Sequence, residues 1–265
     1  MIDIFAKPLG ALLNLVYKLV DGMGLDFGGL SAYAMAVIIT TVLFKLIILP
    51  LNLKQTKSMK EMQKIQPKIK ELQEKYKKDP QTLNVKTMEL YKEHNVNPFG
   101  SCLPLLIQFP ILIGFFRVLR NPEKYVSVYE TITNKAFLWI KDIGYAANAI
   151  GDKTNEIAEG VINGLNIGIN IPFIGQALPI MAILAALLTY VQSKMMALNT
   201  PTGNSDNPAQ ASQNTMTKIM PIMIFFFGLS MPVGLVIYWV VGNIFTIAQQ
   251  YLTNRSIGKI KEESN

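Results

Sequence analysis

The residue types that most often carry out catalysis or bind metals are scarce in this 265-residue chain. Cys102 is its single cysteine and His94 its single histidine. One cysteine forms no internal disulfide and no multi-cysteine metal site, and one histidine argues against the usual zinc and Ser-His-Asp arrangements. From its polar setting, His94 is predicted to be a solvated residue at a helix end. The composition therefore predicts no catalytic residue, no metal site and no cofactor, and it disfavours an enzyme.

Lys45 is a charged residue at a position where charge is costly. It lies in TTVLFKLIILP, residues 40–50, inside an apolar run over residues 31–53. A charge at the centre of a membrane helix costs roughly 2.5–3.5 kcal/mol on insertion scales. Leu53, at the end of the run, is eight residues away, which is about 12 Å along a helix. A lysine stem covers about half of that distance, so snorkelling to the surface is insufficient.

The predicted spans offer Lys45 no negative partner, because none of them contains Asp or Glu. This absence also argues against proton relays and intramembrane aspartyl proteolysis, which depend on such carboxylates. We therefore expect a water-filled cavity, open to the cytoplasm, in which an acidic or anionic partner comes from outside the protein. Other polar residues of the spans could line it, although a single polar residue in a span more often forms a helix–helix hydrogen bond: Thr41, Gln108, Thr189, Gln192 and Asn243.

The helices that must position Lys45 are visible as long apolar stretches separated by charged segments. Half of the residues are hydrophobic and 16% are charged. The pattern predicts an all-α polytopic membrane protein with five transmembrane helices. We expect the five spans at 30–53, 102–120, 171–197, 218–231 and 233–252. Outside the membrane we expect an interfacial amphipathic helix and linker at 1–29 and a loop with interfacial helices at 121–170. On the cytoplasmic side we expect a helical hairpin at 54–97, a loop at 198–217 and a short tail at 253–265.

Lysine counts predict the orientation of these spans. Residues 51–97 contain 11 lysines and 6 acidic residues, whereas residues 121–170 contain 4 lysines and 6 acidic residues. Positively charged loops remain in the cytoplasm, so the N-terminus is predicted outside and the C-terminus inside. The net charge of +7 would also suit nucleic acid. The long apolar segments favour a membrane instead, and no direct nucleic-acid partner is expected.

The segment at 54–97 is predicted to form an antiparallel helical hairpin. The break at Asp79-Pro80 separates two amphipathic stretches, because proline disfavours helix continuation at this point. The first stretch carries a face of lysines that either contacts partners or is a solvated, positive-inside surface. That face comprises Lys57, Lys60, Lys64 and Lys68.

Four long motifs carry a resemblance to a known family. They are LPLNLKQTKSMKEMQKIQPKIKELQEKY (49–76), HNVNPFGSCLPLLIQFPILIGFF (94–116), FLWIKDIG (137–144) and KIMPIMIFFFGLSMPVGLVIYWVVGNIFTIAQQYL (218–252). In these motifs the chain resembles the membrane protein insertase family that includes bacterial YidC and its mitochondrial and chloroplast counterparts. The match covers most of residues 1–255, in order.

The resemblance implies a substrate groove in the inner leaflet that carries a basic residue, usually arginine, five positions before a proline. Lys45 occupies that position before Pro50, and the groove partners of the family correspond to Gln192 and Trp239. Trp239 alone would otherwise be interpreted as a membrane-interface anchor. Such a protein receives hydrophilic external segments of clients and releases their apolar segments into the bilayer.

The resemblance also implies partners and a location. The expected partners are newly made membrane proteins, the Sec translocon, the targeting machinery and membrane lipids, and the expected location is the bacterial plasma membrane. The 13 residues after Leu252 leave ribosome contact open. From the residues alone, an anion channel that uses Lys45 and a membrane scaffold remain the alternatives.

Overall fold

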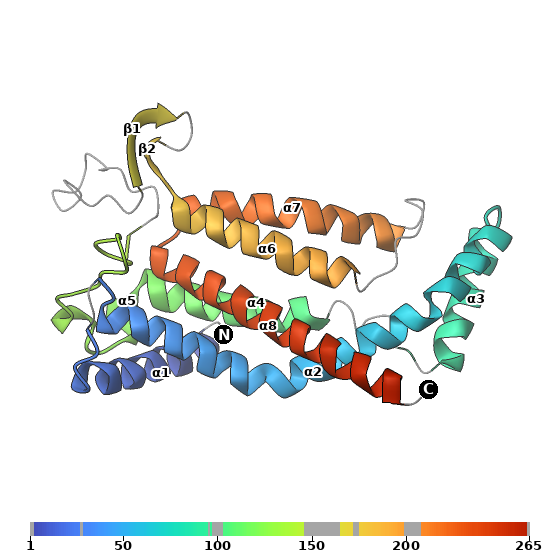
Figure 1. Cartoon of the computed structure of the whole chain (residues 1–265), viewed down its shortest axis with the longest axis horizontal. Helices are drawn as coiled ribbons and strands as arrows, with labels where there is room; N and C mark the ends of the chain where they lie inside the picture. Colours follow the sequence, from blue (N-terminus) through green and yellow to red (C-terminus); the bar gives the residue numbers. More distant parts are fainter. Residues whose placement is uncertain are drawn as a thin grey trace.

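The computed structural model describes residues 3–26, 29–94, 96, 103–145, 165–171, 175–198 and 208–263, and these are mostly helical. The longest helices other than α1 (Asp3–Gly22) run along the long axis of an elongated molecule (Figure 1). They are α2 (Ala32–Lys75), α4 (Leu103–Arg120), α6 (Ile180–Leu198), α7 (Pro208–Ser230) and α8 (Val233–Glu263). The predicted loops at 121–170 and 198–217 and the tail fall partly outside the described residues.

α2 is one continuous helix that joins the first predicted span to the predicted hairpin. It begins after the cap residue Ser31, whose hydroxyl accepts a hydrogen bond from the Ala34 amide, and it has 44 residues, or about 66 Å. Pro50 and Pro67 lie inside it without ending it. The predicted boundary at residues 53 and 54 therefore marks the end of the apolar surface and not the end of the helix.

α3 (Pro80–Glu93) folds back against the last turns of α2. Asp79 caps α3, because its carboxylate accepts a hydrogen bond from the Thr82 amide at 3.1 Å, and Pro80 is tolerated in the first turn. The two helices share a small apolar core that is separate from the main one. Its buried members are Ile65, Ile69, Leu90 and Val96.

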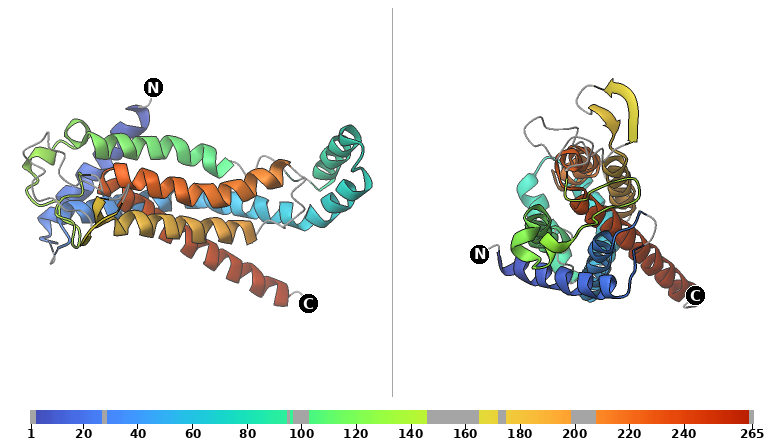
Figure 2. Two further views of the ribbon diagram at one scale, coloured as in Figure 1. Left: turned by 90° about the horizontal axis from the view of Figure 1, so that it is seen from above. Right: turned by 90° about the vertical axis from the view of Figure 1, so that its left-hand side faces the viewer.

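α1 (Asp3–Gly22) lies across one end of the long helices (Figure 2). Asp3 connects it to neighbouring elements, since its carboxylate accepts hydrogen bonds from the Tyr125 hydroxyl at 2.7 Å and from Arg117 at 3.2 Å. The hydrogen bond from Tyr125, together with the nearby positive charges, holds the pKa of Asp3 below its usual value. α1 is thereby fixed to the end of α4 and to the single-turn helix α5 (Pro122–Tyr125).

Gly10 provides the closest approach of α1 to α5. A Cβ atom at this position would lie 2.6 Å from the Tyr125 carbonyl oxygen, which is backbone and cannot rotate away. We expect Gly10→Ala to lower the free energy of unfolding by about 1–3 kcal/mol through overpacking, despite the better helix propensity of alanine. Thermal unfolding in detergent would measure the loss. Gly22→Ala is the matched control, because a Cβ there meets nothing within 4 Å, and equal midpoints for both variants would contradict the explanation.

The third predicted span begins later than the sequence pattern indicates. Residues 165–171 and 175–178, which were predicted to lie in the external loop and in the start of the span, form the antiparallel strands β1 (Leu165–Ile171) and β2 (Gly175–Leu178). LNIGINI alternates apolar and polar or small residues, which is a strand period rather than a helix period. α6 therefore starts at Ile180, directly after Pro179.

The external loop also differs from its predicted form. Interfacial helices were expected at 121–170, but in the described part of this loop the helical segments are only α5 and the short 3-10 turn η2 (Tyr129–Thr131). Isolated β-bridges join Lys135 to Asp142 and Phe137 to Ile140 within the loop, and Phe137 to Leu30 before α2. α7 and α8 are longer than the spans predicted for them. α7 begins ten residues before the predicted span at 218–231, and α8 continues eleven residues beyond the predicted span at 233–252.

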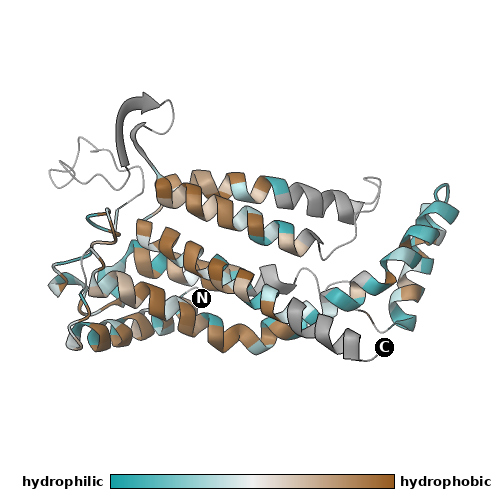
Figure 3. Ribbon diagram, viewed as in Figure 1, coloured by the Kyte–Doolittle hydropathy of each residue, from teal (hydrophilic) through white to brown (hydrophobic). Residues whose placement is uncertain are grey.

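Apolar residues predominate in the central part of the long helices, and polar residues gather on α3 and the end of α2 (Figure 3). Within the described residues, the segments Ala32–Met62 and Val233–Thr253 are long and apolar enough to cross a membrane. Ile180–Met196 and Lys218–Ser230 are shorter apolar helices. The main core joins α1, α2, α4, α6 and α8.

Candidate functional site

Lys45 is buried between α2 and α8, with 8% of its surface exposed. Its ammonium group lies 3.5 Å from the Thr246 hydroxyl of α8, which is a long hydrogen bond. Its stem passes Gly242, where an added Cβ would lie 3.2 Å from Lys45 Cε and 3.6 Å from Nζ. The absence of a side chain at Gly242 therefore makes room for the lysine between the two helices.

In the part of the chain that the structure describes, no carboxylate forms an ion pair with Lys45. The Thr246 hydroxyl already donates to the Gly242 carbonyl at 2.8 Å, so it can accept from the lysine but does not neutralise it. A buried ammonium with one weak neutral partner is costly unless water or an external anion completes its shell. The site is therefore suited to a transient negative partner.

α8 is the helix that connects the predicted site residues. Tyr238, Gly242 and Thr246 are spaced by four residues and so lie along one face of it. On this face Tyr238 accepts a hydrogen bond from Gln108 of α4 at 2.6 Å and stacks on Phe115 at 4.2 Å between ring centroids. Gln108 is thus engaged in a helix–helix contact, which is the simpler of its two predicted roles.

Asn243 of α8 forms a second contact of this kind. Its side-chain amide donates to the Thr189 hydroxyl of α6 at 2.8 Å, and that hydroxyl donates to the Ala185 carbonyl at 2.7 Å. Both polar side chains are buried and satisfied. Their hydrogen bond holds α6 against α8 at the position next to Gly242.

We expect Thr189 and Asn243 to contribute to stability as a coupled pair. In a double-mutant cycle with Thr189→Val and Asn243→Leu, measured by denaturant titration in detergent, the coupling should be about 1 kcal/mol, the usual range for such bonds in membrane proteins. Strictly additive losses from the two substitutions would contradict this interaction.

The remaining predicted site residues are distributed around this centre. Thr41 is buried one turn before Lys45, and its hydroxyl donates to the Val37 carbonyl at 2.7 Å. Gln192 is half-buried on α6, one turn after Thr189. The structure thus places Lys45, Thr41, Thr189, Gln192 and Asn243 on α2, α6 and α8, and among these described residues a side-chain hydrogen bond joins Thr189 to Asn243.

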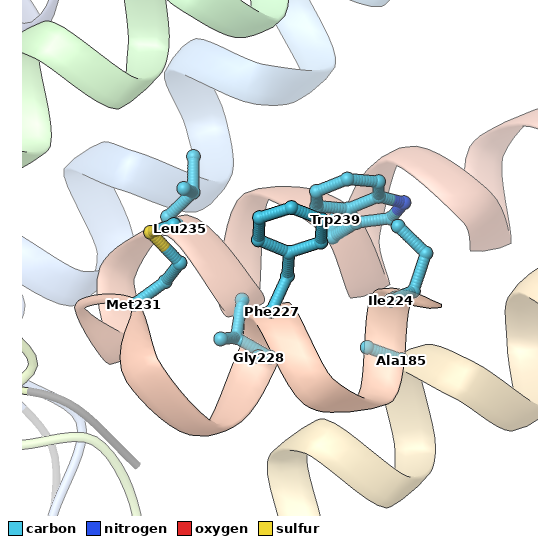
Figure 4. A pocket seen from close by; sticks show the side chains of 8 residues that line it. Ala185, Ile224, Phe227, Gly228, Met231, Leu235 and Trp239 are labelled. Carbon is cyan, nitrogen blue, oxygen red and sulfur yellow. The ribbon is translucent and has the colours of Figure 1, made fainter. Parts of the chain in front are cut away.

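Trp239 lines an apolar pocket formed by α6, α7 and α8. Figure 4 shows its ring beside Phe227 and Ile224 of α7, with Ala185 of α6 completing one wall. The pocket lining is entirely apolar apart from the tryptophan nitrogen: Ala185, Ile224, Phe227, Gly228, Met231, Leu235, Val236 and Trp239. The Trp239 ring therefore packs among apolar side chains rather than beside a charged group.

The lysine face of the hairpin is largely open to solvent. Lys57, Lys64 and Lys68 are exposed and Lys60 is half-buried. Lys68 Nζ lies 3.0 Å from His94 Nε2 at the end of α3, and His94 Nδ1 lies 3.1 Å from the Leu90 carbonyl. His94 is exposed at the helix end and joins the two arms of the hairpin.

Several buried polar groups near the site were not identified from the sequence. In the described residues, Gln55 Nε2, Gln249 Oε1 and Gln250 Oε1 are buried without a hydrogen-bond partner. They follow Lys45 on α2 and Thr246 on α8, which places them toward the hairpin end of the two helices. Buried polar atoms of this kind call for water or another ligand. In the sequence, the four-residue spacing of Tyr238, Gly242 and Thr246 could have predicted that this face of α8 contacts Lys45.

Comparison with known proteins gives consistent results over most of the chain. The model of the 60Kd inner membrane protein family matches residues 26–261. The chain is 35% identical to a membrane protein insertase YidC of Fusobacterium nucleatum, covering 94% of each protein. It is 34% identical to the membrane protein insertase YidC of Clostridium perfringens, covering 97% of this chain and 96% of the relative. It is also 35% identical to the membrane protein insertase MisCA of Bacillus subtilis, over 92% of this chain and 76% of the relative.

Proposed function

The chain belongs to the 60Kd inner membrane protein family of non-enzymatic membrane protein insertases, and from this premise we propose how its residues insert clients. A hydrophilic external segment of a client enters from the cytoplasm between α2 and α8. Lys45 holds acidic groups of that segment while the apolar segment of the client moves into lipid. The observation that carries the proposal is the buried Lys45 without a carboxylate partner in the described chain.

The polar groups that follow Lys45 support a hydrated entry route. Gln55, Gln249 and Gln250 have buried atoms that need partners, and all three lie between Lys45 and the hairpin end of the molecule. Water in this seam would lower the cost of bringing a charged client segment to Lys45, because it preserves much of the hydration of the charge. Gln192 then flanks the route, Thr41 lies one turn beyond its inner end at Lys45, and the hairpin lysines are its first positively charged surface.

Exposed apolar side chains on α6 and α7 support the release step. Leu187 is 56% exposed, Ile222 58% and Phe226 57%. The apolar pocket around Trp239 is lined by residues of the same helices and of α8. A client helix leaving the polar seam would meet this surface, where dispersion contacts and burial replace its contacts with water.

A bilayer around this protein is proposed to be thinner on the α7 side. The apolar helix Lys218–Ser230 has 13 residues, or about 20 Å, whereas a hydrocarbon core is about 30 Å thick. Hydrophobic mismatch thins the adjacent bilayer, which shortens the path of a polar segment through lipid. The five-span, N-outside and C-inside topology and a location in the bacterial plasma membrane form part of the proposal, as do the Sec translocon and the targeting machinery as partners.

The experiment that tests insertion uses purified protein in liposomes. A small single-span client with an acidic external tail should acquire a protease-protected tail with the protein and not in protein-free liposomes. Equal protection in both would contradict the proposed function. Solute flux that is independent of any client would instead support an anion channel.

A further inference from the structure

The FLWIKDIG motif forms a tight turn whose tip carries two large apolar side chains. Phe137 and Ile140 exchange two backbone hydrogen bonds of 2.9 Å, so Leu138 and Trp139 are the two residues of the turn. Ile140 is buried at 1% exposure and Phe137 packs against the main core. Leu138 and Trp139 point away from that core, with 53% and 41% of their surfaces exposed.

Leu138 adopts a backbone conformation that a leucine rarely takes. Its φ is +54°, and no other non-glycine residue among those described has a positive φ. Glycine is the usual residue at this position of a two-residue turn, because it has no Cβ to clash. A large apolar residue in a strained and exposed position gains little from packing. Strained backbone conformations are concentrated at functional sites, so the conformation of Leu138 indicates a functional role for this residue.

The turn is held at the beginning of α2. The Leu138 amide donates to the Gly29 carbonyl at 2.6 Å, and the Ser31 amide donates to the Ala136 carbonyl at 3.0 Å. Gly29 has a φ of +92°, and a Cβ there would lie 3.0 Å from the Leu138 carbonyl oxygen, so only glycine permits this approach. Since Ser31 caps α2, the turn lies level with the first residues of the apolar segment Ala32–Met62.

A second apolar surface lies at the same end of the molecule. α1 exposes Ile4, Phe5, Leu15 and Leu19, and it crosses the ends of the long helices together with the loop that contains the turn (Figure 2). An amphipathic helix of this kind lies in the membrane interface, and tryptophan is enriched at the same depth. The occupant that fits both surfaces is lipid.

We propose that Leu138 and Trp139 form an interfacial anchor that enters the outer leaflet and sets the depth of the N-terminal end of α2. The anchor rests on the proposed placement of α2 across the bilayer. Its rigid attachment through Gly29 and Ser31 transmits this depth to α2, and therefore to Lys45, about four turns further along the same helix.

Trp139 fluorescence tests the anchor directly, because the chain has only two tryptophans. With Trp239→Phe as the background, Trp139 is the single emitter. In phosphatidylethanolamine–phosphatidylglycerol vesicles its emission should shift to shorter wavelength than in the unfolded chain. Lipids brominated near the headgroup should quench it about twofold more strongly than lipids brominated near the bilayer centre. Strong quenching by aqueous iodide, or no quenching by either lipid, would overturn the proposal.

Leu138→Gly separates membrane anchoring from a merely structural role. Glycine relieves the positive φ but makes the unfolded chain more flexible, so the thermal midpoint in detergent should change little while quenching of Trp139 by headgroup-brominated lipid falls. A large drop in the midpoint, or unchanged quenching, would show that Leu138 acts within the fold and would overturn the proposal. These readouts do not depend on insertion activity, so failure of the anchor and failure of the proposed function are distinguishable.

Discussion

Lys45→Glu is expected to reduce insertion of a client with an acidic external tail by on the order of tenfold or more. Two unit charges about 4 Å apart interact by about 4 kcal/mol at an effective dielectric constant of 20, and about 1.4 kcal/mol already corresponds to a tenfold change. Reversing the sign converts an attraction into a repulsion within a site that is 8% exposed. The initial rate of tail protection in liposomes measures the effect.

Lys45→Arg should retain activity, because it keeps the charge and adds donors, whereas Lys45→Ala should lose activity for the same acidic client. A client with an uncharged tail is the control and should be much less sensitive to all three substitutions. Equal insertion of the acidic client by the four proteins would contradict an electrostatic role for Lys45. Thinning of the bilayer and the apolar surface of α6 and α7 would then have to account for insertion.

Gly242→Leu is expected to reduce insertion of the acidic client several-fold without changing any charge. A Cβ at this position already lies 3.2 Å from Lys45 Cε, so a larger side chain must displace the lysine stem from the α2–α8 seam. The displaced ammonium no longer reaches its position beside Thr246, and effects of such misplacement on a binding step are large. The same liposome assay measures the loss.

The controls for Gly242 separate displacement of Lys45 from general damage. In a Lys45→Ala background, Gly242→Leu should cause little further loss, since the group it displaces is absent. Gly234→Ala on the same helix should be nearly neutral, because its Cβ would make ordinary contacts of 3.5 Å or more. Additive losses from Lys45→Ala and Gly242→Leu would show that Gly242 acts on packing rather than through the lysine.

Hydrophobicity predicts where the long helices lie but not where they end. The apolar surface of α2 ends near residue 53, yet its backbone hydrogen bonds continue to Lys75, because polar residues with good helix propensity extend the same helix. α8 likewise continues to Glu263. The opposite error occurred at Gly175–Leu178, which was assigned to a span but forms strand β2, paired with β1, whose sequence LNIGINI alternates as a strand does.

The candidate site was only partly predictable, because its contacts depend on how helices face each other. Lys45 stood out as a charge in an apolar run, but its neighbours Gly242 and Thr246 lie about 200 positions further along the chain. Thr189 and Asn243 were predicted either to line a cavity or to form a helix–helix hydrogen bond, and they hydrogen-bond each other. Polarity identifies a residue that needs a partner, whereas only the packing of helices decides which partner it has.

A charge-exchange experiment tests the central claim, that Lys45 is the counter-charge of the client, most directly. Wild-type protein and Lys45→Glu are each reconstituted without a membrane potential and supplied with clients whose external tails differ only in acidic or lysine residues. The account predicts that the wild type prefers the acidic tail and that Lys45→Glu prefers the lysine tail. A preference for the same client in both proteins would contradict it.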